Sequence, residues 1–343
     1  MLNIVGCAPS SGSTLFADLL DSSRYSACGE EINIFAVKKL YDFENFKRNI
    51  QKRSISSIYL FSEGINTDVL HHYGLNISLL NDIIRRSSTL REFSDLFSEH
   101  YLALRGKRDD GVLFEKTPQN ILCIKEFLEH FPNSYFIFMV RNPIFVFNSM
   151  RKRGFSKYIS LITWYFETAK FYKFRDHNRV LVLRYEDLVK KPYTLTKETI
   201  YKTSNIRVSE SEIEEVFRNN RYRKLYSIRL KSWDVKSVGD IVDANKKVVQ
   251  KEYLEEFTEV FSAMINPRYA SLFNMEKVSF TDLLHYFNYY DEVVEKTGSI
   301  NSSDRKPKGS MSDHFRLFLR WAIAFRWGEA RIRDLFTFMN PLL

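Results

Sequence analysis

The chain has 343 residues, of which 44% are hydrophobic and 15% aromatic, and its formal net charge is +9. Such a composition is typical of a globular protein of one or two domains. Its apolar runs are shorter than the roughly 18–20 residues of a membrane-spanning helix. The three cysteines lack CxxC spacing, so neither a disulfide framework nor a zinc site is expected at Cys7, Cys28 and Cys123.

The positive net charge suits a polyanionic ligand, a nucleic acid or an anionic membrane surface. The basic residues are scattered and no nucleic-acid-binding motif accompanies them, so nucleic acid is not an expected partner. A basic stretch followed by an apolar one, as in a secretory signal, does not open the sequence. We therefore expect a cytoplasmic protein.

The first predicted elements are a strand at Leu2–Val5, a loop of small residues and a helix over 15–20. Gly12 allows close approach of a ligand to the backbone, and Ser13 and Thr14 place hydroxyls beside the free N–H groups of a helix start. This arrangement predicts an anion-binding loop. It is not a Walker A loop, because no Gly-Lys-Ser/Thr follows Gly12. A purely structural strand–turn–helix connection has similar sequences.

Further strands and helices alternate along the chain. The predicted strands cover residues 112–115, 135–140 and 180–183, and the predicted helices cover 77–104, 118–131, 142–151 and 209–218. This alternation predicts an α/β fold with a central parallel sheet. We expect the helical region 77–104 to act as a lid or a substrate-side insert, within an insert at about 41–110.

In parallel sheets, ligands bind beyond the carboxyl ends of the strands. The small-residue loop, Lys116 and Arg141 all follow strand ends, which predicts one shared site. A guanidinium such as that of Arg141 can hold a phosphate with two hydrogen bonds. Ser149 lies nearly two turns along the next helix, and Arg153 lies one turn further on the same face. A βα turn that happens to carry a surface arginine would look the same.

The C-terminal region has a different composition. Residues 297–312 are typical of a flexible linker, which predicts a main domain over 1–296. A helix rich in Arg, Phe and Trp is expected within 313–343. Such a helix can lie on an anionic membrane, pack on the core or join a second subunit to form a homo-oligomer.

Three motifs together resemble the sulfotransferases that use 3′-phosphoadenosine 5′-phosphosulfate (PAPS). The family's 5′-phosphosulfate loop, Pro-x-Ser-Gly-Thr/Ser-Thr, corresponds to residues 9–14. Its 3′-phosphate motif, an Arg at a strand end and a Ser eight residues later, corresponds to Arg141 and Ser149. Its late Tyr-Glu-Asp-Leu corresponds to residues 185–188. The resemblance extends in order over about residues 1–270.

Within this family, the chain is most similar to the branch that contains tyrosylprotein sulfotransferases and related bacterial enzymes. The similarity rests on Cys-Gly-Glu-Glu at 28–31 and Lys-Thr-Pro at 116–118. It implies a P-loop-like three-layer fold, PAPS as donor, adenosine 3′,5′-bisphosphate (PAP) as product, and no metal. Glu31 would be the general base, and Lys116 would contact the transferring sulfuryl group. The implied nucleotide contacts are Ser10, Ser11, Gly12, Ser13, Thr14, Arg141, Ser149, Arg153, Tyr185 and Ser227.

These roles agree with the chemistry. Sulfuryl transfer is an in-line displacement that needs a base for the acceptor proton and positive charge at the leaving oxygen. By position alone, Glu31 could equally be a solvated carboxylate and Lys116 a surface lysine. If Glu31 is not the base, Glu30 and the pair His71 and His72 are the next candidates.

The chain departs from the family pattern at three positions. Ser10 stands where the loop normally carries a Lys or Arg that stabilises the leaving group, so we expect another cation, Lys116, to do so. Asn33 and Val37 stand where the tyrosylprotein branch has basic residues, which argues against an acidic peptide acceptor.

We therefore predict sulfuryl transfer to a hydroxyl of a carbohydrate, lipid or small metabolite. Two alternatives remain: a nucleotide kinase, which would depend on magnesium, and a non-catalytic nucleotide- or membrane-binding protein, which would bind PAPS without turnover.

Overall fold

The computed structural model describes residues 1–29, 31–52, 77–219, 248–261, 263–298 and 308–324, and the single residues 241, 243 and 245. The side chains of 49–52, 77 and 318–324 are excepted. Four candidates lie outside the described residues: Glu30, His71, His72 and Ser227.

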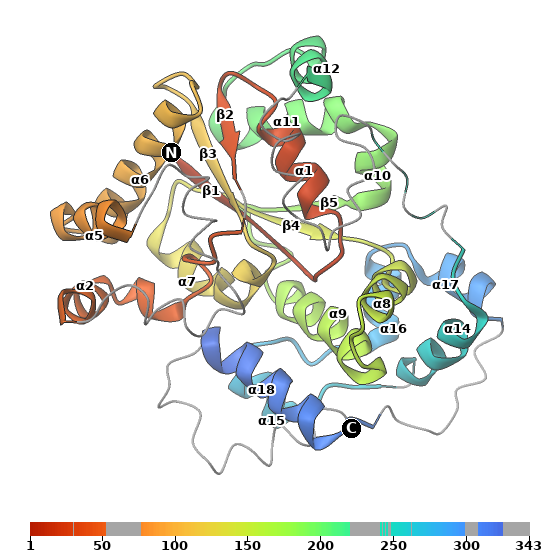
Figure 1. Ribbon diagram of the computed structural model, residues 1–343. Helices are drawn as coiled ribbons and strands as arrows, with labels where there is room; N and C mark the ends of the chain where they lie inside the picture. The colour runs from red at the N-terminus through yellow and green to blue at the C-terminus, as the bar shows by residue number, and fades with distance from the viewer. Residues whose placement is uncertain are drawn as a thin grey trace.

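Five parallel strands form the central sheet, in the order β2-β3-β1-β4-β5 (Figure 1). They are β1 (Leu2–Cys7), β2 (Ser26–Cys28), β3 (Val112–Lys116), β4 (Phe136–Val140) and β5 (Val180–Arg184). The predicted α/β fold with a parallel sheet is thus confirmed. The short strand β2 was missed, because three residues are too few to show a hydrophobic period.

Strands β1 to β4 are buried along their whole length, and the alternating side chains of the sheet join two separate hydrophobic clusters. In β4, Phe136, Phe138 and Val140 belong to one cluster, whereas Ile137 and Met139 belong to the other. A strand covered on both sides needs apolar residues at every position. This double burial explains the unbroken apolar run from which the strand was predicted.

The first face of the sheet, which carries Ile137 and Met139, is covered by helices from two parts of the chain. These helices are α1 (Ser13–Leu20), α10 (Tyr185–Lys190), α11 (Pro192–Ser204) and α12 (Glu210–Asn219). Figure 1 shows them on the same side of the sheet. Since α1 follows directly from the loop after β1, packing on this face holds the loop at the sheet edge.

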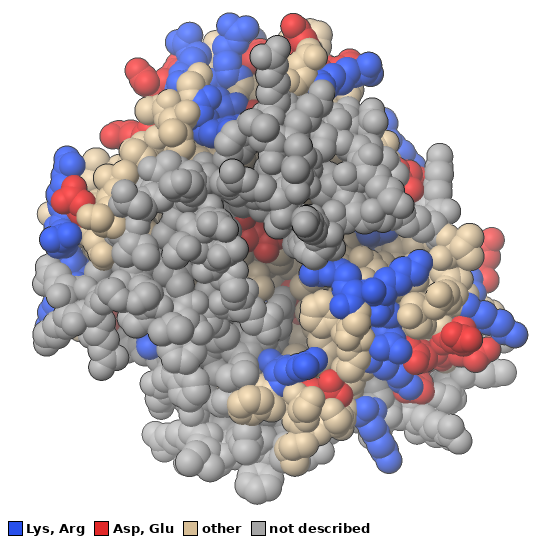
Figure 2. Space-filling view, in the orientation of Figure 1, with Lys and Arg blue, Asp and Glu red and all other residues tan. Residues whose placement is uncertain are grey.

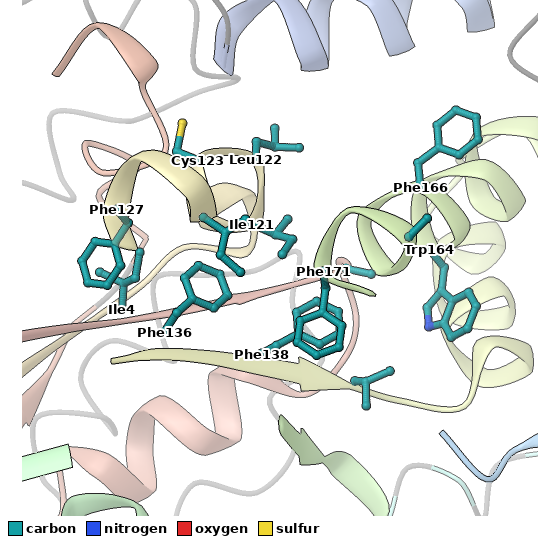
Figure 3. Packing of buried hydrophobic residues seen from close by; sticks show 14 of the residues in the cluster. Ile4, Ile121, Leu122, Cys123, Phe127, Phe136, Phe138, Trp164, Phe166 and Phe171 are labelled. Atoms are coloured by element: carbon teal, nitrogen blue, oxygen red, sulfur yellow. The ribbon is translucent and has the colours of Figure 1, made fainter. Parts of the chain in front are cut away.

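The opposite face is covered by a larger group of helices. These are η1 (Lys38–Tyr41), α2 (Phe43–Lys52), α5 (Ile77–Arg86), α6 (Leu90–Leu104), η2 (Pro118–Cys123), α7 (Ile124–His130), α8 (Pro143–Lys152), α9 (Lys157–Tyr172), α14 (Lys251–Phe257), η4 (Thr258–Val260), α15 (Pro267–Leu272), α16 (Phe280–Tyr286), α17 (Tyr290–Thr297) and α18 (Met311–Ala324). In Figure 3, the rings of Phe138 on β4 and Phe171 on α9 lie face to face, with centroids 4.1 Å apart. No helix among the described residues is long and apolar enough to cross a membrane.

Two predicted helical regions each divide in two. The region 118–131 forms η2 and then α7, and the region 77–104 forms α5 and α6. Thr89 caps α6, because its Oγ1 accepts a hydrogen bond from the backbone N–H of Glu92 at 3.1 Å. Phe93 and Phe97 of α6 are fully buried in the core. Helix α6 therefore packs on the core that covers the sheet, and the insert at about 41–110 and its role as a lid stay predictions.

The described part of the C-terminal helix, α18, is joined to the core. Asp313 accepts hydrogen bonds from the hydroxyl of Ser156, at 2.6 Å, and from the N–H and hydroxyl of Ser310. Ser156 in turn caps α9. Leu317 has no exposed surface and belongs to the main cluster. The linker at 297–312 and the separate helix at 313–343 stay predictions, and residues 299–307 and 325–343 lie outside the described residues.

A pair of substitutions on α18 tests whether this helix is part of the folding unit. Leu317→Ala should lower the free energy of unfolding by about 2–5 kcal/mol, because it leaves a cavity in the core. Phe315→Ala is the matched control, since Phe315 is 55% exposed. Thermal unfolding of both variants measures the effect. Equal melting temperatures would show that α18 is separable from the core.

Candidate active site

The predicted site residues lie at one edge of the sheet, in the order of the strands. Glu31 follows β2, Lys116 ends β3, the loop 8–14 follows β1, Arg141 follows β4 and Tyr185 follows β5. Because the strands are parallel, all their carboxyl ends meet at this edge. The residues therefore form a row with a carboxylate and a lysine at one end and an arginine and a tyrosine at the other.

The loop after β1 has the backbone of an anion-binding turn. Ser10 and Gly12 have positive φ angles of 66° and 89°, and Gly12 is the N-cap of α1. A Cβ atom at Gly12 would lie 2.2 Å from Cδ2 of Tyr185, so only glycine fits beside this ring. Ser13 and Thr14 form the first turn of α1, where N–H groups face outward from the helix end. The hydroxyl of Ser11 is buried and has no hydrogen-bond partner among the described residues.

Arg141 is a buried cation next to this loop, with 7% of its surface exposed. One of its terminal nitrogens donates to the carbonyl of Ser10 at 3.1 Å, and its Nε donates to Oδ1 of Asn245 at 2.9 Å. Its guanidinium lies 4.7 Å from the ring centroid of Tyr185. Burial lowers the pKa of Arg141. A cation held away from water in this way favours a bound anion as partner.

A carboxylate behind Arg141 connects several segments. Oε1 of Glu186 accepts hydrogen bonds from the N–H of Asn142 and from Nδ2 of Asn245, both at 3.0 Å. Its Oε2 accepts a bond of 2.6 Å from the hydroxyl of Tyr289, which is fully buried. Glu186 thus positions Asn245, and Asn245 positions Arg141. Sequence reasoning missed Asn245 and Tyr289, because nothing in the sequence relates them to a strand end so far away.

The predicted base and the predicted lysine form an ion pair at the other end of the row. Nζ of Lys116 lies 2.9 Å from Oε1 of Glu31. The side chain of Lys116 is 5% exposed and that of Glu31 is 33% exposed. The pairing follows from the neighbouring strands β2 and β3, in which Cys28 is the register partner of Phe114. The exposed carboxylate can meet an acceptor while the buried lysine stays behind it.

A buried hydrogen-bond network supports this end of the site. The carboxylate of Glu115 accepts bonds from the hydroxyl of Thr117 and from Nδ2 of Asn120, both at 2.6 Å. Thr117 also accepts from the N–H of Asn33, and Asn120 donates to the carbonyl of Val5. The network therefore connects the segments that follow β2, β3 and β1. Burial raises the pKa of Glu115 to about 7, against the lowering effect of its two donors.

This raised pKa predicts a pH dependence of stability. Between pH 4.5 and about 7 the folded protein holds a proton on Glu115 that the unfolded chain releases, so the free energy of unfolding falls as pH rises. The loss amounts to roughly 3 kcal/mol at 1.36 kcal/mol per pKa unit. Glu115→Gln removes the titrating group, and its amide can donate to the unpartnered Oδ1 of Asn120. Denaturant unfolding across this pH range should therefore give a flatter profile for Glu115→Gln.

The control for this experiment is Glu129→Gln, because the side chain of Glu129 is 55% exposed. Its profile should follow that of the unmodified protein. If Glu115→Gln has the same slope as the control, Glu115 does not carry the pH dependence.

Of the remaining residues predicted for the nucleotide side, Ser149 lies on α8 and Arg153 directly follows it. Ser149 is half-buried, and its carbonyl accepts a bond from the N–H of Arg153 at 3.3 Å. The guanidinium of Arg153 reaches back to the loop, where it lies 3.4 Å from the hydroxyl of Ser10. The structure therefore brings Arg153 to the loop as well as Arg141. Within the described parts of the chain, no group of three or more His, Cys, Asp or Glu side chains is placed to hold a metal ion.

Comparisons with known proteins identify the family of this chain. A model of the sulfotransferase family matches residues 3–210. A search of curated proteins finds no match. Similar solved structures include the sulfotransferase domain of the Synechococcus PCC 7002 olefin synthase, with 15% identity and a TM-score of 0.49 over 75% of this chain and 92% of that one. The sulfotransferase domain from the curacin biosynthetic pathway has 16% identity and a TM-score of 0.48, over 81% and 98% of the two chains.

A third structure, the sulfotransferase STF9 from Mycobacterium avium, has 13% identity and a TM-score of 0.36, over 69% of this chain and 78% of that one. The stretch matched by the family model contains the ion pair of Glu31 and Lys116, the anion-binding loop, Arg141 and Tyr185. It also covers more than half of the chain. This protein therefore belongs to the sulfotransferase family and is a sulfotransferase enzyme.

Proposed function

We propose that this enzyme transfers the sulfuryl group of PAPS to a hydroxyl of a carbohydrate, lipid or small-metabolite acceptor. One observation carries the proposal: an anion-binding loop lies between a buried arginine on one side and a carboxylate–lysine pair on the other, along one sheet edge. Bound there, PAPS would supply an activated sulfuryl group on its 5′-phosphate.

The residues fit both charged ends of such a donor. The turn around Gly12 suits the 5′-phosphosulfate, because its positive φ angles are those of an anion-binding turn. The buried hydroxyl of Ser11, which has no hydrogen-bond partner among the described residues, suits the same group. Arg141 suits the 3′-phosphate, since a buried guanidinium binds phosphate with strong charge-assisted bonds. We assign Ser149 to the same phosphate, and Ser13, Thr14, Arg153 and Tyr185 to the nucleotide side.

The other end of the row supplies the chemistry. Glu31 takes the proton of the acceptor hydroxyl while the acceptor oxygen bonds to sulfur, and the electron pair of the broken sulfur–oxygen bond stays on the 5′-phosphate. Lys116 lies beside Glu31 and balances the negative charge of the transferring group. The pair also sets the carboxylate in a fixed position.

The segment after Glu31 carries no positive charge at the two positions where binding of an acidic peptide would need one. Asn33 is buried and Val37 is half-buried, so neither position presents a positive charge to an acceptor. This favours a neutral hydroxyl compound over an acidic peptide, although the motifs at 28–31 and 116–118 resemble those of tyrosylprotein sulfotransferases.

The function is tested by transfer from labelled PAPS to a panel of hydroxyl acceptors in excess chelator. The unmodified protein should transfer label. Glu31→Gln is nearly isosteric and removes only basicity, so it should keep its affinity for PAP and lose transfer by about 10²–10⁴-fold. The exposed Glu129 provides the control variant Glu129→Gln, which should transfer normally.

Three results would contradict these roles. Normal transfer by Glu31→Gln would mean that another group is the base. Activity that strictly requires magnesium would favour the alternative function of a nucleotide kinase. Tight binding of PAP with no transfer to any acceptor would favour the non-catalytic nucleotide-binding protein.

Arg141→Ala tests the assignment of the 3′-phosphate. Loss of a charge-assisted contact costs about 1.5–3 kcal/mol, so the affinity for PAP should fall roughly 10- to 150-fold. The affinity for adenosine 5′-phosphate, which lacks the 3′-phosphate, should be nearly unchanged. Calorimetric titration of both nucleotides measures this difference, with Arg91→Ala as a control because that side chain is 66% exposed. Equal losses for both nucleotides would place Arg141 elsewhere on the ligand.

A further inference from the structure

The loop lacks a positive charge at the position where the leaving group needs one. Ser10 is neutral, whereas the family loop that this chain resembles carries a basic residue there. As the sulfuryl group leaves, charge builds up on the bridging oxygen of the 5′-phosphate, and a cation at that oxygen lowers the barrier. Some other side chain must supply this charge.

Two nearby cations are assigned to other groups of the donor. Lys116, which the sequence suggested, lies 2.9 Å from the carboxylate of Glu31 and is buried on the β3 side of the loop. Arg141 is held by the side chain of Asn245, by the carbonyl of Ser10 and by the ring of Tyr185. Both are placed for the sulfuryl group and the 3′-phosphate, respectively.

Arg153 lies at the end of the loop that contains Ser10. It follows α8, and its terminal nitrogen lies 3.4 Å from the hydroxyl oxygen of Ser10. The ring of Phe155, 5.4 Å from its guanidinium carbon, supports it from the other side. Figure 2 shows Lys and Arg side chains gathered over this part of the molecule, beside a hollow with an acidic group at its centre.

We propose that Arg153 replaces the missing basic residue of the loop and stabilises the leaving 5′-phosphate. This inference rests on the function proposed above. A basic side chain at position 10 would extend past the place of the Ser10 hydroxyl, and a terminal nitrogen of Arg153 lies 3.4 Å from that hydroxyl. The two positions are therefore coupled, since cations at both would repel each other at this distance.

This coupling gives a rescue experiment. Ser10 already has a positive φ angle, and Lys is not branched at Cβ, so Ser10→Lys adds no new type of backbone strain. The variants to compare are Arg153→Ala, Ser10→Lys with Arg153→Ala, and Lys152→Ala as the control for loss of an exposed neighbouring charge. Melting temperatures establish that each variant is folded.

Nucleotide affinities give a readout that does not depend on turnover. The ligands are PAP, adenosine 3′-phosphate and adenosine 5′-phosphate, measured by calorimetry. Arg153→Ala should weaken PAP and adenosine 5′-phosphate by about 10-fold or more and leave adenosine 3′-phosphate unchanged. Ser10→Lys in the same chain should restore most of the lost affinity. Transfer from PAPS should follow the same pattern, with a loss on the order of 10²-fold in kcat for Arg153→Ala and recovery in the double variant.

Other outcomes overturn the inference in recognisable ways. If Arg153→Ala weakens PAP and adenosine 3′-phosphate instead, and Ser10→Lys restores nothing, Arg153 belongs to the 3′-phosphate. If Arg153→Ala behaves like Lys152→Ala, Arg153 contacts neither phosphate. In both cases PAP binding and transfer by the unmodified protein keep the proposed function intact, whereas an unmodified protein that neither binds PAP nor transfers sulfuryl groups overturns both.

Discussion

The parallel pairing of β1 with β3 and β4 is the constraint on which the site depends. In this register Val5 lies beside Lys116 on one side and beside Ile137 on the other. A slip by one residue would exchange the two faces of a strand that is buried on both. Gly6 allows the close packing here, because a Cβ atom would lie 2.6 Å from the Phe136 ring and 2.8 Å from the backbone nitrogen of Ile121.

The same constraint divides the site into two halves with different electrostatics. On the β2–β3 side, a carboxylate and a lysine form a close pair next to a buried hydrogen-bond network around Glu115. On the β4–β5 side, the guanidinium groups of Arg141 and Arg153 converge on Ser10. The first half suits proton transfer, and the second suits a ligand with several negative charges. The loop after β1 lies between them, where the proposed mechanism places the transferring group.

The half of the site around Arg141 is completed by residues beyond the stretch that the family model matches, which ends at residue 210. Asn245 orients Arg141, and Tyr289 at the start of α17 holds Glu186. Leu317 of α18 is buried against the same core. The C-terminal third of the chain therefore contributes to the site through contacts that position other residues.

The sequence by itself determined the parallel α/β fold, because four of the five strands contain apolar runs that alternate with predicted helices. It also determined the candidate row of Glu31, Lys116, Gly12, Arg141 and Tyr185, since local motifs at strand ends are short-range features. The tertiary structure decided which of these side chains meet. Three contacts depend on segments that are brought together by packing. Lys116 pairs with Glu31, and Arg153 reaches Ser10. Asn245 holds Arg141 directly, and Tyr289 holds the carboxylate that positions Asn245. Such contacts have no local sequence period, so a pattern along one chain cannot reveal them.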